Sequence, residues 1–146
     1  MAWIRVPLAW LAAVIGMAVT GVVVQTQFVL GALADVGADI TLADRMEMTL
    51  DDLAGFGPTY AAFIAIGFAI AFFAGWLVIR YARLPRPLVH AVAGAACMGL
   101  MLVLMEQVFF GVPVIAGARS AAGFSAQVGL GALWGLVYAA IAGARR

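Results

Sequence analysis

Hydrophobic positions in this chain gather in long blocks separated by short polar stretches. Apolar runs cover about residues 6–30, 59–79, 88–110 and 121–142. Each run can cross a bilayer as a helix, because ~20 apolar residues at ~1.5 Å per residue span the ~30 Å hydrocarbon core. The first run exceeds the ~7–15 apolar residues of a signal peptide, so we interpret it as a membrane helix too. The pattern predicts an all-α membrane protein with four transmembrane helices in a bundle.

Residues 31–57 form the one sizeable hydrophilic stretch. Leu42, Met46, Leu50 and Leu53 recur there at helical spacing, while carboxylates occupy another face. Thr41 stands three residues before Asp44, which is typical of a helix N-cap. We predict one or two short amphipathic helices in this acidic loop between the first two membrane helices. They would lie on the membrane surface or over the mouth of the bundle.

The composition agrees with a membrane protein that has no separate soluble module. Of the 146 residues, 66% are hydrophobic and 10% are charged, whereas a soluble domain has about 25% charged residues. The chain is therefore predicted to be a single domain, residues 1–146. One cysteine, Cys97, excludes an intrachain disulfide. The basic residues are all arginine, which with the high alanine and glycine content suggests a bacterial source.

The arginines predict how the chain is oriented. With a cytoplasmic N-terminus, the cytoplasmic side would hold Arg5, Arg80, Arg83, Arg86, Arg145 and Arg146. Only Arg45 and Arg119 would then lie outside. Cytoplasmic loops of membrane proteins carry an excess of basic residues. We therefore expect a multi-pass protein of the bacterial inner (plasma) membrane, with both termini in the cytoplasm and residues 31–57 outside.

Small residues recur every four positions on several predicted helices. Such rows let neighbouring helices approach closely, either inside one bundle or between copies. Internal packing is the simpler interpretation, and a face for self-association is the alternative. The glycines expected to serve in this packing are Gly67, Gly75, Gly131, Gly135 and Gly143.

Polar side chains gather at the predicted outer ends of the membrane helices. Glu106 is the only acidic residue in any apolar run, and a carboxylate there costs several kcal/mol unless it is neutralised, paired or hydrated. It would either pair with Arg119 or line an outward-facing polar cavity. The residues predicted to form this cluster are Gln25, Gln27, Tyr60, Glu106, Gln107, Arg119, Ser125 and Gln127.

Several kinds of chemistry have no support in the sequence. Ser120 and Ser125 belong to the outer side and His90 to the inner side, so no Ser–His pair can form. HExxH, paired-cysteine and phosphate-binding glycine motifs are absent. We expect no metal site, no cofactor and no nucleic-acid partner, and no catalytic residue can be assigned.

Three functions remain open. The first is a non-catalytic accessory subunit or homo-oligomeric module, which contacts lipids and packs on itself or on other membrane subunits. The second is a small transporter or channel that uses Glu106 and the outer glutamines. The third is a lipid- or quinone-binding membrane enzyme or carrier, supported by the same polar cluster.

Overall fold

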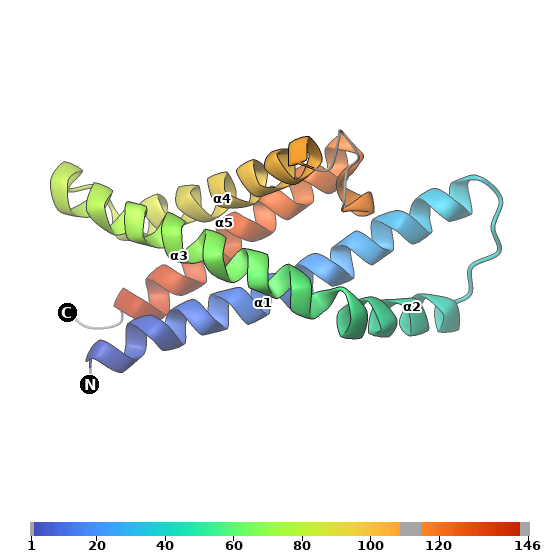
Figure 1. Ribbon diagram of the computed structural model, residues 1–146, viewed down its shortest axis with the longest axis horizontal. Helices are drawn as coiled ribbons and strands as arrows, with labels where there is room; N and C mark the ends of the chain where they lie inside the picture. The colour runs from blue at the N-terminus through green and yellow to red at the C-terminus, as the bar shows by residue number, and fades with distance from the viewer. Residues whose placement is uncertain (1, 109–114, 144–146) are drawn as a thin grey trace.

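The computed structural model describes residues 2–108 and 115–143. It confirms an all-α fold in which four long apolar helices, each a candidate membrane span, pack together (Figure 1). The predicted positions 109 and 110, Arg145 and Arg146 lie outside the described residues. The elements are α1 (Ala2–Asp35), α2 (Leu42–Gly55), α3 (Gly57–Ala82), α4 (Arg86–Val108), the short 3₁₀ helix η1 (Ala116–Ala118) and α5 (Ala121–Gly143).

The first helix is longer than the sequence pattern predicts. It continues through Ala32, Leu33 and Ala34 to Asp35, because these residues favour helix even where the apolar run has ended. It stops where Gly37 adopts a φ of 93°. The amides of Gly37 and Ala38 donate to the carbonyls of Ala34 and Leu33, at 3.0 and 3.1 Å, which closes the helix end. The helix therefore extends past residue 30, where the predicted span ends, and only residues 36–41 of the acidic stretch link α1 to α2.

One amphipathic helix, α2, occupies the predicted acidic loop. Thr41 caps it: its hydroxyl accepts from the amide of Asp44 at 3.2 Å, and the Asp44 carboxylate accepts from the amide of Thr41 at 2.8 Å. This capping box satisfies two backbone donors, the amides of Thr41 and Asp44, at the start of the helix. The Thr41 hydroxyl also donates to the Asp44 carboxylate at 2.7 Å, and this bond, together with the one from the Thr41 amide, lowers the pKa of Asp44 below its ordinary value.

The four long helices form a ring in the order α1, α3, α4, α5, in which each packs on the next and α5 closes on α1. Figure 1 shows that α1 begins and α5 finishes at one end, which also holds the turn from α3 to α4. We call the opposite end, where α1 leads into α2, the α2 end. In Figure 1, α2 and the last turns of α1 extend beyond α4 and α5 there.

Glycines bring α4 and α5 together at backbone distance. A β-carbon at Gly94 would overlap the carbonyl oxygen of Gly131, and one at Gly135 would overlap the carbonyl oxygen of His90. On the α3 side, a β-carbon at Gly67 would come within 2.7 Å of the Cys97 sulfur. The rows of small residues are thus used inside the bundle.

The remaining glycines singled out from the sequence face α4 more loosely. A β-carbon at Gly75 would lie 3.5 Å from Val89, and one at Gly143 would lie 3.9 Å from the guanidinium carbon of Arg86. These distances are ordinary van der Waals contacts. Gly75 and Gly143 therefore do not need to be glycine for steric reasons within the bundle.

Helix lengths indicate where the membrane ends. With 23 residues, α4 and α5 are each ~34 Å long, close to the ~30 Å hydrocarbon core. With 34 residues, α1 is ~51 Å long, so it projects past the core. In Figure 1, α1 and α2 extend beyond α5 at the α2 end, so the extra length of α1 projects there.

Candidate functional site

The predicted polar cluster does lie at the α2 end, but its members do not form a single site. Tyr60 and Gln127 are buried together in the bundle. Gln27 and Arg119 line an open groove. The other predicted members are Gln25, which packs beside η1, and Glu106, Gln107 and Ser125, which are exposed.

Gln127 ties three helices together. Its Oε1 accepts from the Tyr60 hydroxyl at 3.1 Å, and its Nε2 donates to the carbonyl of Gly21 at 2.8 Å. Both side chains are almost fully buried, Tyr60 at 0% and Gln127 at 1% exposed. Gly21 leaves room for them, because a β-carbon there would lie only 3.0 Å from the Tyr60 ring. This bonded triad fixes α1, α3 and α5 in register.

Helix α2 contacts α1 through its polar side. The buried Thr26 hydroxyl donates to the Asp52 carboxylate at 2.6 Å. The Arg45 guanidinium donates to Gln27 Oε1 at 2.9 Å, and Gln27 Nε2 donates to the Thr49 hydroxyl at 3.2 Å. Arg45, Thr49 and Asp52 stand at i, i+4 and i+7, a polar stripe that the sequence analysis did not single out.

The apolar stripe of α2 points away from the bundle. Leu42, Met46 and Leu50 are 75%, 62% and 63% exposed, although amphipathic helices ordinarily bury this side. Leu53, at the same stripe's end, is partly buried against the core. Polar contacts therefore hold α2 in place over most of its length.

Asp52→Ala is expected to loosen α2 from α1, because it leaves the Thr26 hydroxyl without its acceptor across the two helices. A hydrogen bond to a charged group contributes about 1.5–3 kcal/mol. Hydrogen–deuterium exchange in nanodiscs should show faster exchange of α2 amides, while the cores of α4 and α5 keep their protection. Asp51→Ala is the matched control, since Asp51 is exposed. Equal protection of α2 in both variants would contradict this role of Asp52.

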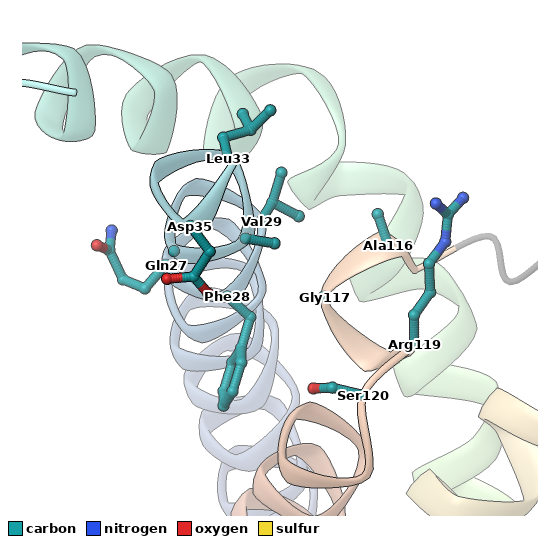
Figure 2. Close-up of a pocket in the computed structure, with 11 residues that line it drawn as sticks. Gln27, Phe28, Val29, Leu33, Asp35, Ala116, Gly117, Arg119 and Ser120 are labelled. Atoms are coloured by element: carbon teal, nitrogen blue, oxygen red, sulfur yellow. The ribbon is translucent and has the colours of Figure 1, made fainter. Parts of the chain in front are cut away.

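A groove of about 600 Å³ opens at the α2 end between the last turns of α1 and the segment that leads into α5 (Figure 2). Figure 2 shows the end of α1 facing the segment that carries Ala116 and Gly117, with Ser120 pointing toward α1. The groove has an apolar wall formed by Phe28, Val29 and Leu33. Its polar and charged rim is formed by Asp35, Arg119 and Ser120.

Gly117 forms the close contact at the base of this groove. A β-carbon there would come within 2.6 Å of the carbonyl oxygen of Gln25, so this position needs glycine. Beside it, the Gln25 Oε1 atom is buried and accepts no hydrogen bond. Gln25 was a predicted member of the polar cluster, but no pattern in the sequence predicts this close approach to Gly117.

Glu106 lies on the outer surface of the last turn of α4 and is exposed, as is Gln107. Within the described parts of the chain, no ion pair joins Glu106 to Arg119. The carboxylate is thus on the surface of the bundle and does not belong to the buried Tyr60–Gln127 triad.

His90 belongs to an aromatic cluster toward the opposite end of the bundle. Its ring lies 5.7 Å from the Phe72 ring and 4.9 Å from the Tyr138 ring, centroid to centroid. Its Nδ1 is 2.9 Å from the carbonyl oxygen of Arg86, and the residue is only 2% exposed. His90 is therefore a packed core residue, which its four-residue spacing from the buried Gly94 could have indicated.

The arrangement offers amide, hydroxyl and charged groups for binding. In the described segments, no three His, Cys, Asp or Glu side chains come close enough to hold a metal ion. No protein-family model matches the chain, and comparison with curated proteins and with solved structures finds no match. The function must therefore be argued from the geometry of this membrane bundle.

Proposed function

We propose that this chain is a non-catalytic membrane module, a fixed four-helix unit that associates with further copies of itself in the bilayer. The observation that carries the proposal is the closed packing of its interior. Gly94, Gly131 and Gly135 bring α4 and α5 into backbone contact, and the buried Gln127 has partners at both ends of its amide. A closely packed interior of this kind supports a structural role and argues against a transport pathway through the bundle.

The outer surface offers a place for association. An apolar groove of about 880 Å³ runs between α3 and α4. The groove is wide because several of its lining residues are small, among them Ala71, Ala74 and Ala96. Cys97 also lines the groove. Close approach between membrane helices depends on such small residues. This groove, rather than the glycine rows buried between α4 and α5, is where a second copy would pack.

Cross-linking through the native cysteine tests self-association. In mild detergent, a short bismaleimide is expected to join two copies through Cys97, and Cys97→Ala should abolish the product. Ala74→Trp, which fills the groove, should shift the protein toward the monomer in size-exclusion chromatography with light scattering. Ala140→Trp is the matched control, since Ala140 is an exposed alanine of α5. A monomer at all concentrations, with no cross-linked dimer, would overturn the proposal.

The transporter hypothesis has weaker support. Its central residue, Glu106, is exposed on the surface of α4 rather than directed into the bundle. The buried polar side chains Tyr60 and Gln127 already satisfy each other. A lipid-binding role finds more support, because the groove at the α2 end combines apolar and charged walls.

A further inference from the structure

We propose that the groove at the α2 end binds the headgroup of a phospholipid that carries both a phosphate and a primary amine. This inference concerns the groove between α1 and the start of α5, and it does not depend on self-association through α3 and α4.

The groove lies at the depth where lipid headgroups are found. It is lined by residues 27–35 of α1 and by the segment just before α5. Because α5 is about as long as the hydrocarbon core is thick, its first residue, Ala121, marks one edge of that core. A cavity immediately beyond this edge faces the glycerol and headgroup region of one leaflet.

Its walls match an amphipathic ligand. Phe28, Val29 and Leu33 supply an apolar side for the glycerol and the first acyl carbons. Asp35 and Arg119 supply opposite charges on the rim, and within the described residues neither has an ion-pair partner. The volume of about 600 Å³ lies within the ~300–1,000 Å³ range of small-molecule sites.

The two charges select the headgroup. A guanidinium binds phosphate through charge-assisted hydrogen bonds, which suits Arg119 to the phosphodiester. A carboxylate accepts hydrogen bonds from an ammonium group, which suits Asp35 to a primary amine. A quaternary amine has no N–H to donate. A purely anionic headgroup would meet the Asp35 carboxylate in the groove, and like charges repel.

Lipid retention measured by native mass spectrometry tests the proposal. The wild-type protein is incubated with equal amounts of ethanolamine, choline and glycerol phospholipids that share the same acyl chains. We expect retention of the ethanolamine lipid at about three times that of the other two, as one exposed charge pair would give. Arg119→Gln and Asp35→Asn should each remove this preference, while Arg83→Gln and Asp39→Asn, exposed charges outside the groove, should keep it.

A steric variant and a competitor complete the test. Ala32→Trp fills the groove without changing a charge and should lower retention, whereas Ala34→Trp, on the same helix but outside the groove lining, should not. Soluble phosphoethanolamine at equal concentration should fail to displace the lipid; displacement would assign the site to a soluble phosphate compound and overturn the lipid assignment. Equal retention of all three lipids, or unchanged preference in both charge variants, would overturn the proposal as well.

Discussion

Gly135→Leu is expected to disrupt the bundle, giving protein that aggregates or elutes as a mixture in mild detergent. A β-carbon at residue 135 overlaps the carbonyl oxygen of His90 and would lie 3.1 Å from the Cα atom of Ala91. Both belong to the α4 backbone, so no side-chain rotation can relieve the overlap, and the two helices must separate. Overpacking of a core typically costs about 1–3 kcal/mol, and displacing a helix backbone places this variant at the upper end.

The matched control is Gly129→Leu on the same helix. Gly129 is exposed, and a β-carbon there meets nothing within 4 Å. Thermal unfolding in detergent can be measured as the fraction of protein that remains monodisperse. Gly135→Leu should show a clearly lower midpoint than Gly129→Leu. Similar midpoints for both would show that α4 and α5 are not in backbone contact at this position.

Gln127→Leu is expected to be the next most damaging change. Leucine is similar in size but leaves the buried Tyr60 hydroxyl without an acceptor and the Gly21 carbonyl without a side-chain donor. A buried polar group left unpaired costs about 1–3 kcal/mol. Hydrogen bonds between membrane helices average ~0.6 kcal/mol and reach ~1.7 kcal/mol, so we expect a loss of about 1–2 kcal/mol in the free energy of unfolding.

A double-mutant cycle isolates the hydrogen bond. Tyr60→Phe combined with Gln127→Leu should cost less than the sum of the single changes, because the double variant has no unpaired hydroxyl. Gln107→Leu is the control, since Gln107 is exposed. Additive effects, measured by reversible unfolding in mixed detergent, would show that Tyr60 and Gln127 do not interact.

Hydropathy and helix-capping chemistry were enough to predict the four spans and the position of α2. The helix α1 continues to Asp35, beyond the apolar run at residues 6–30, because hydropathy reports a candidate span and not where the helix itself ends. On α5, the predicted packing glycines Gly131 and Gly135 are buried, and burial continues at the same four-residue spacing through Gln127 and Gly123.

The candidate site was harder to predict because burial also depends on what covers each helix end. Glu106 continues the buried row of α4 that contains Gly94, Met98 and Leu102, yet it is exposed. The polar stripe of α2 could be found by spacing. Its docking on Thr26, however, required knowing that α2 faces α1 with its hydrophilic side. Sequence periodicity gives the faces of a helix but not the identity of its neighbour.

The outward-facing apolar side of α2 has a chemical consequence for its methionines. Met46 and Met48 are 62% and 43% exposed, so oxidants can reach both thioethers. Conversion to the sulfoxide makes a methionine polar and usually weakens the packing of a helix whose apolar side is buried. Here the hydrogen bonds of Asp52 with Thr26 and of Arg45 with Gln27 hold α2 on α1. We therefore expect α2 to stay packed on α1 after both methionines are oxidised.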